Sequence, residues 1–366
     1  MKIVPTNPYL KDLPTYQPGR PIEEVARELN LPAHEIIKLA SNENPLGPSP
    51  LALAAMQKVL ANLNLYPDGN AFYLKQKLAE KLGVAPANLV LGNGSNEIIE
   101  FVGHTYFAPG VDVMVSQFCF AIYPLVTKLF GANLITVPAK NHGHDLPAML
   151  KAITPQTRVV FVANPNNPTG TLVPREEVIQ FVNAIPENVL LVMDEAYIEF
   201  LDEPLDLASL VRLGVRPNLL LMRTFSKIFG LAGLRLGYAL GSAQLIEALY
   251  KIKDSYNLDR LTQAIGLAAI EDADHLRRNA EKIKATRART TAALAQLGCT
   301  VLPSATNFLF VKPPRLPAAE VFAALRARNI IVRYFPGPLT GDYLRVTVGT
   351  DLEMDQFLAA LREALD

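Results

Sequence analysis

Short apolar runs alternate with segments of helical period between residues 88 and 250, and this alternation limits the possible folds more than any other feature of the sequence. Helical period is clearest at Glu97–Phe107, Tyr123–Leu129 and Arg175–Ala184. The apolar runs are candidate buried strands: Leu89–Leu91, Val111–Val115, Leu134–Val137, Val159–Ala163, Val189–Met193, Leu219–Met222 and Arg235–Leu240. Nearly continuous apolar strands that alternate with helices indicate a parallel sheet covered on both faces. The pattern therefore predicts an α/β domain built on a mostly parallel, seven-stranded sheet.

The pattern changes on either side of this region. The first forty residues are irregular and rich in proline, apart from a short helical pattern at Ile22–Leu29, and such an arm usually packs on another part of the protein. After residue 252 a long helical stretch from Leu261 to Gln296 leads into strands and a further helix in α+β order. We therefore expect an N-terminal arm over residues 1–30, a large domain over 31–252 and a smaller C-terminal α+β domain over 253–366.

Charge and cysteine content exclude several classes of partner. The 366 residues include 35 Lys and Arg against 35 Asp and Glu, so no bulk charge favours nucleic acid or an anionic membrane surface. The two cysteines form neither a disulfide framework nor a metal-ligand spacing. The N-terminus lacks the apolar region of a signal peptide, and no later run is long enough to span a bilayer. We expect a cytoplasmic protein without a metal, a nucleic-acid partner or a membrane association.

A lysine follows one of the predicted strands. The run Leu219–Met222 leads into Thr224, Ser226 and Lys227, and Arg235 lies eight residues further on. Burial and nearby cations lower the pKa of an amine, and a neutral lysine can form a Schiff base with a carbonyl compound. The arginine can hold a phosphate through its planar fork, and the two hydroxyls are further donors. Taken alone, an ordinary surface lysine and arginine beside a strand end would explain this stretch equally well.

A glycine-containing segment follows the first predicted strand and begins a helix. Ligands of open α/β sheets bind beyond the carboxyl ends of the strands, so this position is informative. Residues 92–97, Gly-Asn-Gly-Ser-Asn-Glu, allow close backbone approach and place helix amides where one phosphate group could bind. An NAD-dependent enzyme would rest on Gly92 and Gly94 alone. Two residues weaken this alternative. The dinucleotide-binding motif Gly-x-Gly-x-x-Gly needs a third small residue, but Glu97 occupies that position. The motif also needs an acid at the end of the next strand, whereas Asp112 begins a strand.

Three further strand ends carry candidate functional residues. The loop Asn-Pro-Asn-Asn-Pro-Thr-Gly at 164–170 has more amide groups than a simple turn needs. Asp194 ends a buried strand and would need a cation there, and Tyr197 could direct its hydroxyl to the same place. Phe120 could stack on a planar ring, although packing in the core would explain it as well.

Two arginines lie in strand-like sequence of the C-terminal domain. In residues 343–348 apolar side chains alternate with others, which leaves Arg345 within semi-buried, strongly β-forming sequence. An arginine in such surroundings needs an anionic partner. Arg333, which ends Asn-Ile-Ile-Val-Arg, occupies a similar position. Both are candidates for binding an anionic ligand.

Taken together, the motifs resemble those of the class II pyridoxal-phosphate-dependent aminotransferases of the aspartate-aminotransferase fold (fold type I), most closely the histidinol-phosphate aminotransferases. The resemblance extends from Tyr16 to Arg345, nearly the whole chain. It rests on Tyr-Pro-Asp at 66–68, Gly-Ser-Asn-Glu at 94–97, Asn-Pro-Asn-Asn-Pro-Thr-Gly at 164–170, Asp-Glu-Ala-Tyr at 194–197, Ser226-Lys227 with Arg235, and Leu-Arg-Val-Thr-Val-Gly at 344–349.

The resemblance implies a role for each residue that contacts the cofactor. Lys227 would form the aldimine with pyridoxal 5'-phosphate, and Asp194 would pair with its protonated pyridine nitrogen. Asn167 and Tyr197 would hydrogen-bond the ring hydroxyl, and Phe120 would stack on the ring. The residues implied to hold the cofactor phosphate are Gly94, Ser95, Asn96, Thr224, Ser226 and Arg235.

The resemblance also implies an assembly and a substrate site. Tyr66 would reach the cofactor phosphate of a neighbouring subunit, which implies a homodimer with shared active sites. Tyr16, Asn44, Arg333 and Arg345 would contact the substrate.

The implied reaction is transamination between L-histidinol phosphate, a phosphorylated amino alcohol, and 2-oxoglutarate. Its products are imidazole acetol phosphate and L-glutamate, formed by a ping-pong route in histidine biosynthesis. An aromatic amino-acid aminotransferase or a phosphothreonine decarboxylase of the same fold would keep every cofactor residue, so both stay open. A non-catalytic regulatory module would need a DNA-binding segment and a basic surplus that the chain lacks. An NAD-dependent enzyme would leave Lys227 and Asp194 unexplained.

Overall fold

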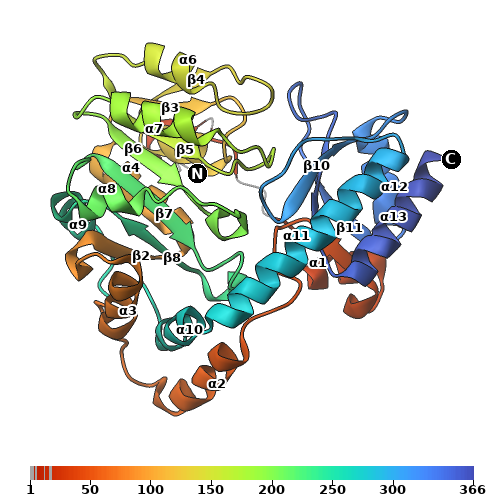
Figure 1. Ribbon diagram of the computed structural model, residues 1–366, viewed down its shortest axis with the longest axis horizontal. Coiled ribbons are helices and arrows are strands. Elements are labelled where there is room, and N and C mark those ends of the chain that lie inside the picture. Colours follow the sequence, from red (N-terminus) through yellow and green to blue (C-terminus); the bar gives the residue numbers. More distant parts are fainter. Residues whose placement is uncertain (1–3, 5, 12, 16–18) are drawn as a thin grey trace.

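Two β-sheets form the framework of the computed structural model, which describes residue 4 and residues 6–11, 13–15 and 19–366. The larger sheet has seven strands and the smaller has five, and they form separate lobes (Figure 1). The helix α11 (Ala273–Gln296) runs from the region of the first sheet across the second.

The seven-stranded sheet contains every strand that the sequence predicts in this region. Its strands are β2 (Leu89–Asn93), β3 (Asp112–Ser116), β4 (Asn133–Val137), β5 (Thr157–Ala163), β6 (Leu190–Asp194), β7 (Leu219–Thr224) and β8 (Leu236–Leu240). They lie in the order β2-β8-β7-β6-β5-β3-β4. Only β8 runs antiparallel to its neighbours, so the predicted, mostly parallel sheet is confirmed.

Helices cover both faces of this sheet, which explains why its strands are apolar at successive positions. In β7, Leu219 and Leu221 join one core cluster, whereas Leu220 and Met222 join a second cluster on the opposite face. The second cluster is closed by α4 (Gly94–Tyr106), α5 (Ile122–Leu129) and α9 (Ala243–Tyr250). The first is closed chiefly by α3 (Phe72–Leu82), α6 (Leu146–Lys151), α7 (Arg175–Ala184), α8 (Ala208–Arg212) and α10 (Arg260–Glu271). Polar side chains can therefore approach a ligand only at the strand ends.

The five-stranded sheet joins the C-terminal part of the chain to a segment near the N-terminus. Its order is β1-β11-β12-β10-β9. These strands are β1 (Ile37–Leu39), β9 (Thr300–Val301), β10 (Phe308–Lys312), β11 (Ile330–Tyr334) and β12 (Leu344–Thr347). The core of this lobe lies between the sheet and three helices, α11, α12 (Ala318–Ala327) and α13 (Asp351–Leu365).

The sheets divide the chain differently from the expected ranges 31–252 and 253–366. Strand β1 lies within the first range, yet it pairs in parallel with β11 of the smaller sheet. Helix α10 lies within the second range, yet it packs on α3 and on α2 (Pro50–Val59) beside the larger sheet. Long-range pairing decides both placements, and residue order along the chain does not reveal it. The ranges themselves stay a prediction.

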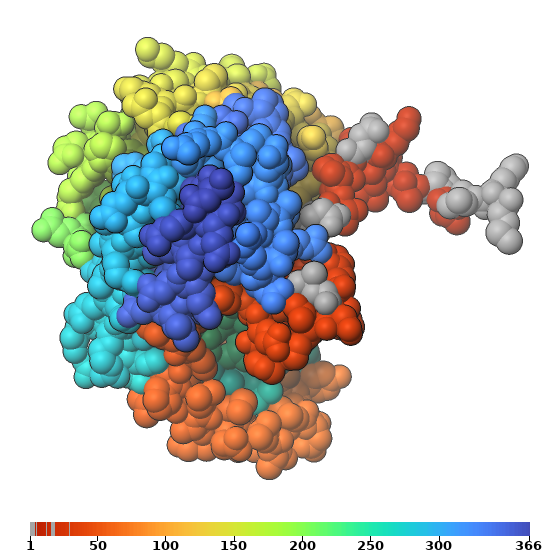
Figure 2. Space-filling model, turned by 90° about the vertical axis from the view of Figure 1, so that its right-hand side faces the viewer, coloured from red at the N-terminus to blue at the C-terminus, as the bar shows by residue number. Residues whose placement is uncertain are grey.

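The N-terminal segment packs on both lobes. Helix α1 (Ile22–Leu29) contributes Val25 and Ala26 to a small cluster with Ile331 of β11. Figure 2 shows α1, in orange-red, beside the blue C-terminal lobe. Further upstream the ring of Tyr9 lies directly over Gly131, which follows α5. Tyr16 lies outside the described residues. Within the described part of the chain, no helix combines the length and the hydropathy needed to cross a bilayer.

A helix break replaces the continuous helical stretch expected from Leu261 to Gln296. Helix α10 ends at Glu271, and α11 begins at Ala273. Asp272 separates them with non-helical angles, φ −90° and ψ 64°, and its carboxylate accepts a hydrogen bond from the His275 amide at 3.2 Å. Aspartate is a preferred N-cap because it satisfies an amide that the helix itself leaves without a partner.

Asp272→Ala should lower the free energy of unfolding by about 0.5–2 kcal/mol, because it removes this cap. Asp272→Asn, which keeps an acceptor oxygen, should lose less. Thermal and urea unfolding of both variants measure the difference. Equal losses in the two variants would show that the cap does not stabilise α11.

Candidate active site

Two adjoining cavities lie at the carboxyl edge of the large sheet. The inner cavity, of about 290 Å³, is lined by the last residues of β5, β6 and β7 and by the first turn of α4. The outer cavity, of about 680 Å³, extends from there between the start of α5 and the strands β11 and β12. Ser41, Phe120, Asn167 and Lys227 line both cavities. A ligand in one can therefore contact a ligand, or another part of the same ligand, in the other.

Lys227 lies where the two cavities meet, three residues beyond the end of β7. Its Nζ is 3.5 Å from the carbonyl oxygen of Ser41 and 5.8 Å from the centre of the Tyr197 ring. Burial, assisted by the positive charge of Arg345, lowers the pKa of Lys227 to about 8. A substantial fraction of this amine is therefore neutral near physiological pH, and a neutral amine can act as a nucleophile or accept a proton.

Asp194 ends β6 and is only 6% exposed. One carboxylate oxygen accepts a hydrogen bond from the Tyr123 hydroxyl at 2.6 Å, and the other accepts one from the Ala196 amide at 3.1 Å. Burial raises the pKa of Asp194, whereas the tyrosine, the amide and the charge of Lys227 lower it. The sequence predicts a cation as the partner of this carboxylate, and the charge of Lys227 acts on it. The hydrogen bond from the Tyr123 phenol is a further partner, which the sequence reasoning missed.

Two elements form an anion-binding end of the inner cavity. The first turn of α4 contributes Ser95 and Asn96, and beside it lies the guanidinium of Arg235. Arg235 Nη1 is 3.4 Å from the Ser226 hydroxyl oxygen. Gly94 has φ +75°, and a Cβ atom there would lie 2.3 Å from Arg235 Nη2. Helix amides, hydroxyls and a guanidinium thus converge where a phosphate group could bind.

Thr224 and Glu97 support this anion-binding end. The Thr224 hydroxyl donates to the Ser226 hydroxyl at 3.0 Å. Glu97 accepts hydrogen bonds from the Asn93 amide at 2.6 Å and from the Asn257 side chain at 2.7 Å. Glu97 occupies the third glycine position of a dinucleotide-binding motif, and here its carboxylate holds the start of α4 in place.

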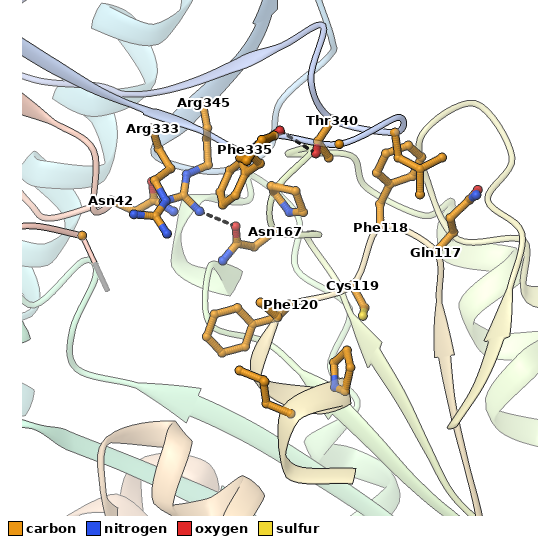
Figure 3. A pocket seen from close by; sticks show the side chains of 18 of the residues that line it. Asn42, Gln117, Phe118, Cys119, Phe120, Asn167, Arg333, Phe335, Thr340 and Arg345 are labelled. Atoms are coloured by element: carbon orange, nitrogen blue, oxygen red, sulfur yellow. Dashed lines mark hydrogen bonds between the residues drawn. The ribbon is translucent and has the colours of Figure 1, made fainter. Parts of the chain in front are cut away.

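Tyr197 and Asn167 lie beside Lys227 in the inner cavity. The Tyr197 hydroxyl accepts a hydrogen bond from the Asn42 side chain at 2.9 Å. The Asn167 oxygen accepts one from Arg345 at 2.7 Å, and its nitrogen is directed away from that arginine (Figure 3). Asn42, which the sequence reasoning did not single out, has φ +55° and is 1% exposed.

The other asparagines of the loop at 164–170 hold the loop together. Asn166 donates to the Phe118 carbonyl oxygen at 2.7 Å and to the Thr169 hydroxyl at 2.9 Å. Asn164 accepts a hydrogen bond from the Val173 amide at 2.9 Å. Of the three asparagines, Asn167 alone lines the cavities. The amide-rich sequence therefore reflects loop structure more than ligand binding.

Arg333 and Arg345 occupy directly opposed positions on β11 and β12 and line the outer cavity. Their guanidinium carbons lie 5.3 and 5.2 Å from the centre of the Phe335 ring, respectively. Arg345 also donates to the Ala40 carbonyl oxygen at 2.8 Å. Figure 3 shows both guanidinium groups together above Asn167. Two neighbouring cations beside an aromatic ring form a strong site for an anion.

Two of the predicted site residues lie elsewhere in the described chain. Asn44 donates to the Ile228 carbonyl oxygen at 2.8 Å and accepts from the Leu46 amide at 3.0 Å, so its amide braces the turn after the lysine and lines neither cavity. Tyr66 is 77% exposed and stacks on Tyr256 with ring centres 4.8 Å apart. In contrast, Phe120 lines both cavities.

Residues 34–361 match the family model described as aminotransferase class I and II. The chain belongs to this family. A histidinol-phosphate aminotransferase from Pseudomonas fluorescens is 47% identical over 359 residues, covering 98% of this chain and 96% of that protein. A crystal structure of histidinol-phosphate aminotransferase from Sinorhizobium meliloti, in complex with pyridoxal 5'-phosphate, superposes with a TM-score of 0.91. That protein is 31% identical, and the match covers all of this chain and 98% of that one.

The fold is that of aspartate aminotransferase. An aspartate aminotransferase from Thermus thermophilus superposes with a TM-score of 0.82 over 99% of this chain and all of that one, at 19% identity. The class of fold and the family predicted from the motifs are thereby confirmed.

Gly94→Ala should weaken binding of a phosphate-bearing ligand at the inner cavity by about 10- to 100-fold, since the added methyl group must displace the Arg235 guanidinium. Pyridoxal 5'-phosphate, the ligand of the Sinorhizobium meliloti protein, is the probe, and spectroscopic titration of the apoprotein measures its affinity. Pyridoxal, which has no phosphate, should lose less.

Gly214→Ala is the matched control for this substitution. Gly214 also has a positive φ, +66°, but a methyl group added there would meet no atom within 4 Å, so only backbone strain is introduced. Both variants should lose stability, and only Gly94→Ala should lose the ligand. If the two variants bind pyridoxal 5'-phosphate with equal affinity, the anion-binding end of the inner cavity does not bind the phosphate.

Proposed function

We propose that the protein is a pyridoxal-phosphate-dependent histidinol-phosphate aminotransferase of histidine biosynthesis. It transfers the amino group of L-histidinol phosphate to 2-oxoglutarate by a ping-pong route, and the products are imidazole acetol phosphate and L-glutamate. The observation that carries this proposal is the pair Arg333 and Arg345 in the outer cavity, immediately beside Lys227. The full-length similarity to the Pseudomonas fluorescens enzyme supports the same substrate.

The inner cavity fits pyridoxal 5'-phosphate. Its anion-binding end, formed by the start of α4 with Ser226 and Arg235, suits the phosphate, and the same cavity holds the buried carboxylate of Asp194 for the pyridine nitrogen. Phe120 also lines this cavity and offers a flat ring to a planar ligand, and Tyr197 and the Asn167 amide nitrogen are donors for the ring hydroxyl. When bound, the cofactor supplies the carbonyl that takes up the amino group and a ring that accepts electrons.

Lys227 is the residue that moves the proton in this site. Its amine lies near the junction of the two cavities, and burial lowers its pKa to about 8. An amine with such a pKa accepts a proton from a substrate carbon and returns it without a large free-energy cost at either step. The Ser41 carbonyl, 3.5 Å away, orients the group.

The outer cavity would bind two different anions in turn. Glutamate presents a carboxylate, whereas histidinol phosphate presents a phosphate ester on the corresponding side. Arg345, fixed by its hydrogen bonds to Asn167 and the Ala40 carbonyl, suits either anion. A dianion needs additional donors, which Arg333 on the opposed strand position supplies. Phe118, Phe120 and Phe335 give the outer cavity aromatic walls.

The proposed enzyme is a homodimer with shared active sites. Tyr66 lines neither cavity of its own chain, and its ring is largely exposed. Other large apolar side chains near it are exposed as well, among them Leu63, Leu65, Phe72 and Tyr73. An apolar surface of this kind is typical of a protein interface. In the dimer Tyr66 would reach the cofactor phosphate of the neighbouring subunit.

Arg333→Ala should lower kcat/KM for histidinol phosphate by about one to two orders of magnitude, because a hydrogen bond to a charged group contributes roughly 1.5–3 kcal/mol. The comparison donor is phenylalanine, which bears one carboxylate and no phosphate. The wild type should prefer histidinol phosphate, and the variant should lose much of that preference. A wild type that prefers phenylalanine would favour an aromatic aminotransferase, and an equal loss for both donors would make Arg333 a structural residue.

Mixed dimers test the shared sites. Tyr66→Ala and Lys227→Ala chains should each be impaired, whereas a heterodimer contains one site in which both residues are intact. Co-expression with two affinity tags isolates the heterodimer, which should recover up to about half of the wild-type activity, because one of its two sites is complete. Heterodimers without recovered activity, or a fully active monomer, would refute the shared site.

A further inference from the structure

We propose that Tyr123 is a positioning residue for the cofactor: its hydroxyl holds the Asp194 carboxylate in the orientation and ionised form that the pyridine nitrogen requires. Nothing in the motifs assigns this residue, and the inference rests on the proposed use of pyridoxal 5'-phosphate. It concerns a contact between two side chains of this chain, 2.6 Å apart and both buried.

The position of Tyr123 is fixed from several sides. Its ring stacks on Phe161 of β5, with centres 4.5 Å apart and planes 9° from parallel, and it is 1% exposed. Its ring makes an edge-to-face contact with Phe120, three residues earlier in the chain and just before α5, with centres 5.6 Å apart. The segment that leads into α5 therefore contributes Phe120 to the wall of the inner cavity, and α5 itself contributes the hydroxyl that holds Asp194. A phenol packed so firmly cannot turn away from Asp194.

The two hydrogen bonds of Asp194 fix the plane of its carboxylate. Tyr123 donates to one oxygen, and the Ala196 amide donates to the other. Each oxygen retains a further lone pair, so the carboxylate can also accept a proton-bearing nitrogen from the inner cavity. Without the phenol, one oxygen of a largely buried carboxylate would lose its donor, and the side chain could rotate about its terminal bond.

The hydrogen bond also opposes the effect of burial on Asp194. Burial raises the pKa of this acid, and the Tyr123 hydroxyl is the first of the groups that lower it again. Burial also raises the pKa of Tyr123 well above its usual range, so the phenol keeps its proton and acts as the donor. The other titratable neighbours of the pair are Lys227 after β7, Cys119 before α5, and Tyr197 and Glu195 after β6.

The expected pH effect has a definite sign. An aspartic acid whose pKa is raised is protonated at higher pH, and a neutral acid cannot pair electrostatically with a pyridinium. Removing the donor in Tyr123→Phe raises the pKa of Asp194 further. The acid limb of the kcat profile should therefore move to higher pH in the variant, whereas KM for the amino donor should change less than about twofold, since Tyr123 lines neither cavity.

Cofactor binding gives the decisive readout, independent of turnover. The probes are pyridoxal 5'-phosphate and 1-deazapyridoxal 5'-phosphate, in which a C–H group replaces the ring nitrogen. Tyr123→Phe should weaken binding of the first by about 10- to 100-fold, as expected for loss of a hydrogen bond to a charged group. Binding of the second should change much less, because no ring nitrogen is present for Asp194 to pair with.

Two further variants separate this role from packing. Tyr238→Phe removes a hydroxyl from another buried tyrosine, on β8, and should leave the affinity ratio of the two probes unchanged. In an Asp194→Asn background, Tyr123→Phe should have little effect on the ratio, since the charge that the phenol holds is already absent. If Tyr123→Phe does not fold, Tyr123→Met fills the space without a donor and is judged by the same ratio.

A wild-type ratio in Tyr123→Phe or Tyr123→Met would overturn the proposal and leave Tyr123 as a packing residue. The proposal also fails if Tyr123→Phe changes the ratio equally with Asp194 intact and in the Asp194→Asn background. These binding experiments do not depend on the amino donor. Failure of the histidinol-phosphate assay would therefore count against the proposed function alone, whereas an unchanged ratio would count against Tyr123 alone.

Discussion

Burial of charged groups at one edge of the large sheet is the constraint on which the site depends. Because helices cover both faces of the sheet, the ends of β6 and β7 are the places where Asp194 and Lys227 can be both deeply placed and open to a ligand. Burial penalises the charged form of each group, so it raises the pKa of the acid and lowers that of the amine. The fold therefore prepares a poorly solvated carboxylate and a reactive amine within one cavity.

The smaller lobe completes this electrostatic arrangement. Arg345 stands on β12, yet its charge contributes to the lowered pKa of Lys227, and its guanidinium fixes the Asn167 oxygen. The side chain of Asn42, just after β1, donates a hydrogen bond to the Tyr197 hydroxyl, and the backbone N–H of Asn42 donates one to the Thr347 hydroxyl of β12. The protonation state of the Lys227 amine thus depends on how the two lobes contact each other. A change in the outer cavity that moves Arg345 would therefore alter the pKa of Lys227 and the position of Asn167 in the inner cavity.

Local patterns predicted most of the fold, and contacts between distant residues account for what they missed. The seven strands were predictable because each is an apolar run between helical segments. The partner of Asp194 was not, since Tyr123 lies 71 residues away and looks like any aromatic residue on a buried helix face. The signal that could have found it is its nearness in sequence to Phe120, since the two rings contact each other where the chain enters α5. Asn42 and Asn44 are equally plausible ligands in Ser-Asn-Glu-Asn, and only their backbone conformations and partners separate them.

Strand β1 has a consequence for the integrity of the smaller lobe. It pairs along Ile330, Ile331 and Val332 of β11 and so occupies what would otherwise be the outer edge of that sheet. An uncovered, apolar edge strand presents free N–H and C=O groups that invite pairing with another chain. A chain that begins after Leu39 would lack β1 and leave the edge of β11 exposed, while most of the core of this lobe would remain. We expect such a chain to aggregate before it loses its fold. The N-terminal segment therefore protects the protein from self-association by strand pairing, quite apart from what it contributes to the site.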